Sequence, residues 1–329
     1  MNYLVIDFGG TLAKHSVMDE ECMVKCQGEG KAPVESKEAF LKFICELYGK
    51  YTEGFDIKGI AISMPGMIDE KKGFVKTAGA YMALYGMNLV EELKGRIPVK
   101  VTVENDGKCG ALAEVWRGNL QECEDGIVLV LGTGIAGGII KNRRIHKGNS
   151  LAAGEFSYIL QGGEEGAGKM VLCQCSVSAL LYQASRRLGI EAKKIHGHEM
   201  WEKLLPGGDE PSQDSCREYT EYSRGINGYE FFELLEKGNE MIAGLYRKYV
   251  ADLSQLIRNL QLIYAPEKIL IGGGISRQPR LLQDIRTACD RLEQIYGEIF
   301  PVDCNLDVCA LGNESNQYGA LYHFLQCSS

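Results

Sequence analysis

The stretch Asp7-Phe8-Gly9-Gly10-Thr11 follows the apolar run Tyr3-Leu4-Val5-Ile6 and decides the fold. An apolar, β-branched run that ends in paired glycines predicts a buried strand followed by a tight turn. Glycine lets backbone N–H groups approach a phosphate that a side chain would hold away. A carboxylate that ends such a strand is costly without a partner, and hydrated Mg²⁺ is a suitable one. We therefore expect Gly9, Gly10 and Thr11 to hold phosphate and Asp7 to hold Mg²⁺ through water; the alternative is an Asp that caps its own turn.

Three further glycine-rich turns follow strand-like runs in the same way. The turn Leu131–Gly138 holds Gly132, Thr133 and Gly134, which we expect to form a second phosphate-binding loop. It is neither a P-loop nor a Rossmann fingerprint, because no Gly-Lys-Ser/Thr and no helix follow it. A glycine-rich hairpin with close sheet contacts is the alternative. The run Gly272-Gly273-Gly274 can admit a flat adenine or a ribose against the backbone.

The remaining turn, Val103-Glu104-Asn105-Asp106-Gly107, carries the residue that we expect to be catalytic. Asp106 follows a predicted strand and precedes a predicted helix, and ligand sites of α/β proteins form at such carboxyl ends. A carboxylate placed there can accept a proton from an attacking hydroxyl, and Asn105 can hold a neighbouring hydroxyl without adding charge. The alternative is an ordinary helix N-cap, which both residue types favour.

Size and composition narrow the class of protein. A chain of 329 residues is too long for one ordinary core, so we expect two domains. The net charge of −8 argues against a nucleic-acid partner. No apolar run approaches the roughly 20 residues that span a bilayer, so no membrane partner is expected. The twelve cysteines are scattered in a chain that begins without a signal peptide, which predicts reduced thiols in the cytoplasm.

Strand-like and helical segments alternate along the chain, which predicts an α/β protein. The strand candidates are rich in β-branched residues and bounded by glycines. Among the helix candidates, Glu38–Tyr48 repeats its apolar residues on one face, and Gly107–Trp116 is rich in small residues. The expected strands are Tyr3–Phe8, Ile57–Ser63, Val99–Glu104, Ile127–Leu131, Ile135–Lys141 and Lys268–Ile271. The expected helices are Glu38–Tyr48, Gly107–Trp116, one long helix from about Phe231 to Tyr264, Leu281–Ile295 and Gln317–Leu325.

Taken together, these motifs resemble the ROK family of sugar kinases and sugar-responsive repressors, from Tyr3 to about Phe324. The residues that carry the resemblance are Asp7–Thr11, Ser63-Met64-Pro65-Gly66-Met67-Ile68-Asp69, Glu104-Asn105-Asp106, Leu131–Gly138, Gly154-Glu155 and Ala265-Pro266 leading to Ile271–Ser276. The resemblance implies two ribonuclease-H-like lobes of the actin-like and hexokinase-like ATPase fold, with a cleft between them. We expect a small lobe at residues 1–115, joined by a C-terminal helix at 313–329, and a large lobe at 116–312.

The resemblance also implies roles for single residues. The Asp7 and Gly132 turns would hold ATP phosphates, Gly272–Gly274 would line the adenosine, and Asp106 would be the general base. The sugar contacts would be Gly66, Asn105, Asp106 and Glu155. Family members carry Gly-His shortly after Gly-Glu, where this chain has Ser157 and Tyr158, so Tyr158 would replace one hydrogen bond to the sugar.

The zinc motif of the family is incomplete here. Family members carry Cys-x-Cys-Gly-x-x-Gly-Cys-x-Glu, whereas Cys173 and Cys175 are followed by neither a third cysteine nor the Glu. A structural zinc needs four ligands, so we expect no zinc of the family type. A site that His196 and His198 complete is the less favoured alternative. These departures resemble a branch that contains β-glucoside and N-acetylmannosamine kinases.

The expected function is ATP- and Mg²⁺-dependent phosphorylation of a hydroxyl of a hexose, an amino sugar or a β-glucoside, by a homodimer. The first alternative is a catalytically weak sugar sensor of the same family. A repressor is less expected, because only six residues precede Asp7 and the net charge is negative. Another actin-like ATPase, such as an acetate kinase, fits the contexts of Gly66 and Asp106 less well.

Overall fold

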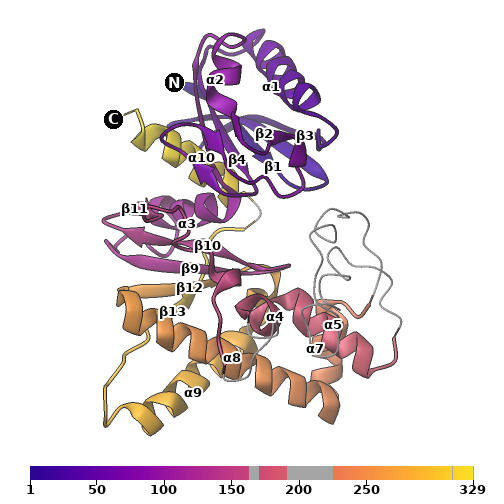
Figure 1. Ribbon diagram of the computed structural model, residues 1–329, viewed down its shortest axis with the longest axis vertical. Helices are drawn as coiled ribbons and strands as arrows, with labels where there is room; N and C mark the ends of the chain where they lie inside the picture. The colour runs from indigo at the N-terminus through magenta and orange to yellow at the C-terminus, as the bar shows by residue number, and fades with distance from the viewer. Residues whose placement is uncertain (163–169, 191–224, 313, 329) are drawn as a thin grey trace. The chain divides into compact units, whose positions relative to one another are not determined.

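The structure is a computed structural model that describes residues 1–162, 170–190, 225–312 and 314–328 (Figure 1). The chain divides into two compact units. The first holds Met1–Val128, Gly137–Gly154 and Cys309–Ser329, and the second holds Leu129–Ala136 and Glu155–Val308. The division into lobes at residue 115, expected from the sequence, stays a prediction.

The first unit is built on a mixed five-stranded sheet with the order β3-β2-β1-β4-β8. Strand β1 pairs antiparallel with β2 through the Asp7–Thr11 turn and parallel with β4, which in turn pairs parallel with β8. The tight turn expected after the first strand is therefore confirmed, and it closes a β-hairpin. The strands are β1 (Asn2–Phe8), β2 (Leu12–Asp19), β3 (Val24–Lys31), β4 (Ile57–Met64) and β8 (Lys100–Asn105).

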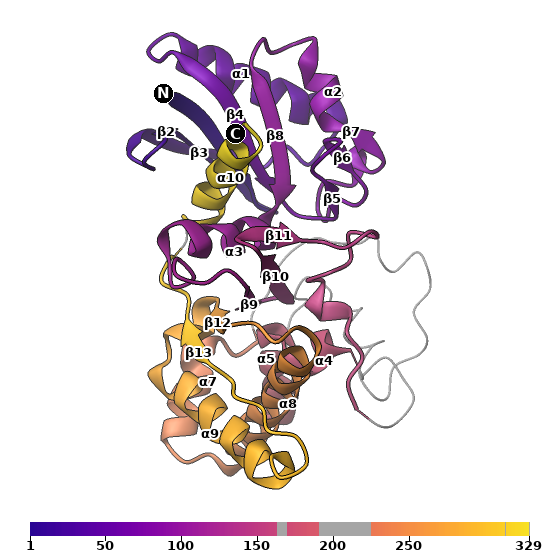
Figure 2. The same ribbon diagram turned by 90° about the vertical axis from the view of Figure 1, so that its left-hand side faces the viewer.

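Alternation along β1 divides the core of this unit between the two faces of the sheet. Leu4, Ile6 and Phe8 face the side covered by helices α1 (Lys37–Thr52) and α2 (Leu89–Lys94), whereas Tyr3 and Val5 pack against α10 (Ser315–Gln326). Figure 2 shows α10 on the opposite face of the sheet from α1 and α2. Because side chains alternate with a period of two, both faces of β1 are apolar and buried.

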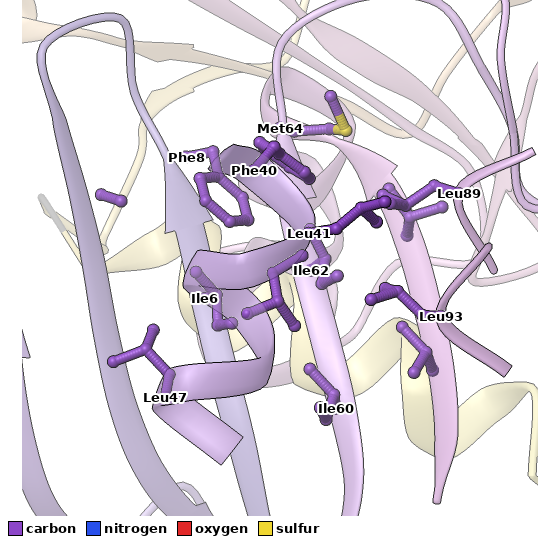
Figure 3. Packing of buried hydrophobic residues seen from close by; sticks show 14 of the residues in the cluster. Ile6, Phe8, Phe40, Leu41, Leu47, Ile60, Ile62, Met64, Leu89 and Leu93 are labelled. Atoms are coloured by element: carbon purple, nitrogen blue, oxygen red, sulfur yellow. The ribbon is translucent and has the colours of Figure 1, made fainter. Parts of the chain in front are cut away.

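Figure 3 shows the larger of these two clusters at close range. Phe8 of β1 lies against Phe40 of α1 with ring centroids 4.4 Å apart, and Leu93 of α2 joins from beside β8. Packing of this kind fixes the ends of β1, β4 and β8 relative to one another. Those ends carry the residues described in the next subsection.

Short elements and two helices complete the first unit. Helix α3 (Asp106–Arg117) follows β8 directly and packs on α10 through Cys109 and Leu321. A three-stranded sheet of β5 (Ile68–Asp69), β6 (Phe74–Val75) and β7 (Met87–Asn88), with the 3₁₀ helix η1 (Met82–Leu84), lies between β4 and α2 in the sequence.

The second five-stranded sheet has the order β11-β10-β9-β12-β13, and its strands β9 and β10 contribute residues to both units. Its strands are β9 (Gly126–Leu131), β10 (Ile135–Lys141), β11 (Arg144–His146), β12 (Lys268–Gly272) and β13 (Leu306–Val308). The helices of the second unit are α4 (Val171–Cys175), α5 (Val177–Arg187), α7 (Gly228–Glu236), α8 (Glu240–Tyr264) and α9 (Pro279–Tyr296), with the 3₁₀ helices η2 (Phe156–Tyr158) and η5 (Gly274–Arg277).

The single long helix expected from about Phe231 to Tyr264 is wrong, because the structure has two helices there. Helix α7 ends at Glu236, and Gly238 then takes a φ of +75° that no continuing helix can accommodate. The side chain of Asn239 accepts a hydrogen bond from the Ile242 N–H and starts α8. The apolar periodicity continues through both helices, so it concealed the break.

Among the described residues, no helix is both long and apolar enough to cross a membrane. The cysteines of the described ranges are all free thiols.

Candidate active site

Asp7 lies in a row of polar residues that crosses the sheet of the first unit. It pairs with Ser63 on β4, which pairs with Glu104 on β8, so the three side chains share one face of the sheet. The Ser63 hydroxyl donates to Asp7 Oδ1 at 2.7 Å, and Asn316 Nδ2 on α10 donates to the same oxygen at 3.3 Å. Burial raises the pKa of the Asp7 carboxyl, although these two hydrogen bonds and Lys14 lower it. A half-buried carboxylate of this kind suits a cation.

We expect Asp7→Asn to stabilise the ligand-free protein at neutral pH. A carboxyl whose pKa is higher in the folded state than in the unfolded state binds its proton more tightly when folded. Its contribution to the free energy of unfolding is therefore lost as pH rises from the ordinary value of 3.8 through the raised one. Asparagine carries no charge and can still accept from Ser63 and Asn316.

Urea unfolding at pH 7 and below pH 4, without Mg²⁺, tests this expectation. The gain of Asp7→Asn should be present at pH 7 and shrink in acid. The control is Asp56→Asn, the same change at an exposed carboxylate that pairs with Lys58. A loss of stability at pH 7 would mean that the hydrogen bonds to the charged form outweigh its burial.

The turn after Asp7 is exposed at Gly9, Gly10 and Thr11. The Gly9 N–H donates to Leu12 O at 3.0 Å and closes the turn, and the Tyr81 hydroxyl donates to Gly9 O at 2.6 Å. These two hydrogen bonds fix the tip of the hairpin, while its backbone stays exposed. This arrangement can present backbone donors to an anion.

Asn105 and Asp106 form the junction of β8 and α3. Asn105 is the N-cap of α3, since its Oδ1 accepts from the Lys108 N–H at 3.0 Å. Its Nδ2 donates to Gly66 O at 2.9 Å and to Asp106 Oδ1 at 3.0 Å, and that oxygen also accepts from the Gly107 N–H at 2.8 Å. The cap interpretation therefore holds for Asn105, while Asp106 is partly exposed in the first turn with one oxygen oriented by two donors.

Gly66 lies beside this junction, where no other residue fits. Its φ is +110°, and a Cβ atom there would lie 2.0 Å from Thr77 O. The structure therefore brings Gly66, Asn105 and Asp106 together, and Asp7 belongs to the same unit.

A buried ion group next to this junction was missed by the sequence analysis. Lys147 Nζ lies 2.6 Å from both Glu104 Oε2 and Glu70 Oε2, and donates to Ile68 O at 3.1 Å. A single lysine after a short strand gives no signal in a sequence, and its partners are distant along the chain. Only Glu104, in the quoted Glu-Asn-Asp run, could have drawn notice.

In the second unit, the Gly132–Gly134 turn is fixed by hydrogen bonds to its backbone. The Gly132 N–H donates to Gly134 O, and Gly132 O accepts from Val177 and Ser178 N–H at the start of α5. The Ser157 hydroxyl accepts from the Ile135 N–H at 2.8 Å. In the sequence, Ser157 stands out only as a departure from the family pattern. In the structure, its hydroxyl fixes the predicted phosphate-binding loop at Ile135.

A cavity of about 390 Å³ opens beside this turn. Gly132, Thr133 and Gly274 line it, whereas Gly134, Gly272 and Gly273 do not. The start of α7 supplies further lining that the sequence analysis missed, including the 81% exposed Tyr229. The other lining residues are Leu131, Val177, Ser178, Leu181, Asn227, Gly228, Phe232, Ile275 and Gln278. The volume lies within the range of ordinary ligand pockets.

Gly273 is placed behind this cavity with its backbone against β9. Its φ is +91°, and a Cβ atom there would lie 2.1 Å from Leu131 O. The Ser276 hydroxyl donates to Gly273 O at 2.8 Å and closes the turn. Gly273 therefore allows the two glycine-rich turns of this unit to lie in contact.

Glu155 is the N-cap residue of the short helix η2, and Tyr158 is the last residue of that helix. Tyr158 is 68% exposed and Glu155 is partly exposed. Cys173 and Cys175 are buried in α4, and burial raises the pKa of the Cys173 thiol to about 11. No cluster of metal-ligating side chains occurs within the described residues, and His196 and His198 lie outside them.

Comparison with known proteins gives matches along nearly the whole chain. The sequence model of the ROK family matches residues 3–326. A β-glucoside kinase of Listeria monocytogenes is 28% identical over 99% of this chain and 98% of its own length. An N-acetyl-D-glucosamine kinase of Citrobacter koseri is 27% identical over 83% of this chain and 84% of its own length.

Solved structures match with the same extent. A ROK family protein of Streptococcus pneumoniae in complex with sucrose has a TM-score of 0.81 and 23% identity, covering 100% of this chain and 99% of the other. A ROK family glucokinase of Streptomyces griseus in complex with glucose and AMPPNP has a TM-score of 0.70 and 25% identity, covering 98% of each chain. The α/β fold class of the actin-like and hexokinase-like ATPases is thereby confirmed.

Proposed function

The chain belongs to the ROK family, and we propose that it transfers the γ-phosphoryl group of ATP to a hydroxyl of a hexose, an amino sugar or a β-glucoside. Similar chains over nearly the full length are named as kinases of β-glucosides and of N-acetylglucosamine, which supports this class of acceptor. The observation that carries the proposal is the junction of β8 and α3, where Asp106 and Asn105 are oriented beside Gly66.

In this proposal Asp106 is the general base. Its Oδ1 is oriented by the Gly107 N–H and Asn105 Nδ2, so the carboxylate has a defined direction in which to accept the proton of the attacking hydroxyl. Asn105, Gly66, Glu155 and Tyr158 bind the remaining hydroxyls of the sugar. Phosphoryl transfer depends mainly on alignment and charge stabilisation, so orientation is the main contribution of these residues.

The second unit supplies the nucleotide site of the proposal. The cavity beside Gly132 and Thr133 has a volume that suits a nucleoside, and Tyr229 offers an aromatic face to a base. The backbone of the Gly132 turn and the Gly9–Thr11 turn bind phosphate oxygens. When bound near Asp7, Mg²⁺ neutralises charge on those oxygens. The half-buried carboxylate of Asp7, whose pKa is raised by burial, supports such a cation partner.

Release of ADP in the presence of single sugars tests the function. The panel is glucose, mannose, N-acetylglucosamine, N-acetylmannosamine, methyl β-glucoside and cellobiose, with the phosphorylated position read by NMR. We expect one of these classes to dominate in kcat/KM. Sugar binding by calorimetry without ADP release from any member would instead support the sugar sensor. The homodimer and the cytoplasmic location stay predictions, and sedimentation at micromolar concentration tests the former.

A further inference from the structure

Lys147 is a buried cation enclosed by two carboxylates and a backbone carbonyl oxygen. Its side chain is 5% exposed, and its Nζ contacts Glu104 Oε2, Glu70 Oε2 and Ile68 O. Its Nζ donates hydrogen bonds to Glu70 Oε2 and Ile68 O, whereas Glu104 Oε2 contacts it as an ion pair without a hydrogen bond. Burial lowers the pKa of Lys147, but the two carboxylates raise it further, and the net direction is upward. Lys147 therefore carries a positive charge at a fixed position in the first unit.

The three oxygen atoms around Lys147 Nζ belong to two segments that lead to the proposed sugar site. Ile68 and Glu70 lie two and four residues after Gly66. Glu104 precedes Asn105 and is fully buried, and its Oε1 accepts from the Asn105 N–H at 2.6 Å. The Lys147 ammonium therefore links the Gly66 loop to the Asn105–Asp106 junction.

The backbone of Lys147 reaches a third segment. Its carbonyl accepts from the Ala153 N–H at 3.1 Å, which closes the loop that leads to Gly154 and Glu155. The first two segments carry residues assigned above to the sugar, and the third ends at Gly154, directly before Glu155 in the sequence. Lys147 itself lines a separate cavity. Lys147 therefore contacts neighbours of the residues assigned to the sugar, and not those residues themselves.

We propose that Lys147 is a positioning residue of the acceptor site. It holds the Gly66 loop, the Asn105–Asp106 junction and the loop before Glu155 in fixed positions relative to one another. The inference rests on the proposed kinase function. A buried cation with two carboxylates is costly to desolvate, and replacing the whole group by apolar residues of similar volume is often neutral or stabilising. What the ion group adds is direction, because it links the segment after Gly66 to Glu104, the residue before Asn105.

Lys147→Met tests the proposal, since methionine fills similar space without donors. We expect kcat/KM for the best sugar of the panel to fall about 100-fold, because small displacements of reacting groups have effects of this size. The KM for the sugar should rise and the KM for ATP should change little. Hydrogen exchange of the ligand-free chain should become faster at the amides of Met67 and Asn105 and stay unchanged in the second unit.

Lys72→Met is the matched control. Lys72 follows the same loop, but its side chain is 75% exposed and its pair with Asp69 spans 3.7 Å. The same chemical change should leave exchange and kinetics as in the wild type. If Lys147→Met does not fold, Glu70→Gln removes one charge at the partly exposed end of the ion group and should give a smaller effect in the same direction.

The kinetic measurement and the hydrogen-exchange measurement together distinguish failure of this inference from failure of the kinase proposal. A wild type without activity on any sugar would overturn the kinase function, whereas the exchange arm would still report whether Lys147 fixes the two segments. Wild-type exchange and wild-type sugar KM in Lys147→Met would overturn the positioning role. Equal increases in both KM values, with faster exchange throughout the chain, would also overturn it, because they indicate general destabilisation.

Discussion

Asp106→Asn is expected to lower kcat by about 10²- to 10⁴-fold, the usual contribution of a positioned general base. Asparagine has nearly the same shape, and its Oδ1 can keep the hydrogen bonds from the Gly107 N–H and from Asn105 Nδ2. It cannot take up a proton at neutral pH, so the attacking hydroxyl loses its acceptor. The sugar should still bind, since Asn105 and Gly66 are unchanged.

The measurement compares kcat from ADP release with sugar binding by calorimetry. Asp56→Asn makes the same change at a surface carboxylate paired with Lys58, and should match the wild type in both. A kcat near that of the wild type in Asp106→Asn would remove Asp106 from the chemistry. The junction would then be a helix start with no proton acceptor, and the base would have to be sought elsewhere in the first unit.

The elements that the sequence predicts well are those with strong local signals. The strands β1, β4, β8, β9, β10 and β12 all lie where β-branched runs bounded by glycine placed them. Buried strands have this composition because both of their faces meet apolar layers, as Leu4 and Val5 of β1 do. The positions of the four glycine-rich turns followed from the same strands.

Features that depend on distant residues were not predictable in this way. Lys147 pairs with Glu70 and Glu104, and a Cβ atom at Gly66 would clash with Thr77. Neither contact joins residues at a fixed separation along the sequence, so no local pattern predicts it. The Tyr229 side of the 390 Å³ cavity comes from a helix start that is far along the sequence from both glycine-rich turns. Local periodicity reports which face is buried, but not which chain segment covers it.

Gly273→Ala is the second change for which we expect a large effect. The backbone of Gly273, with φ of +91° and ψ of 167°, lies in a region that is almost restricted to glycine. Occupying it with alanine costs about 1–3 kcal/mol of strain. The added Cβ would also lie 2.1 Å from Leu131 O, which is a clash with backbone and not with a movable side chain.

The clash would act on ATP binding through the neighbouring turn. Leu131 precedes Gly132 and Thr133, and all three line the 390 Å³ cavity. A displaced Leu131 would move the donors of that turn, so kcat/KM for ATP should fall by about 100-fold. Urea unfolding should show the loss of stability, and the sugar KM should change less than the ATP KM.

Gly274→Ala separates backbone strain from crowding of the ligand. Within the described ranges, and apart from its chain neighbours, a Cβ atom at Gly274 would have no protein atom within 4 Å, and the residue lines the cavity. The free energy of unfolding should therefore stay at the wild-type value. If adenosine lies against this backbone, the ATP KM should still rise, because the methyl group occupies space meant for the nucleoside. An unchanged ATP KM in Gly274→Ala, together with a raised one in Gly273→Ala, would place the adenosine away from the triple glycine and leave Gly273 with a purely structural task.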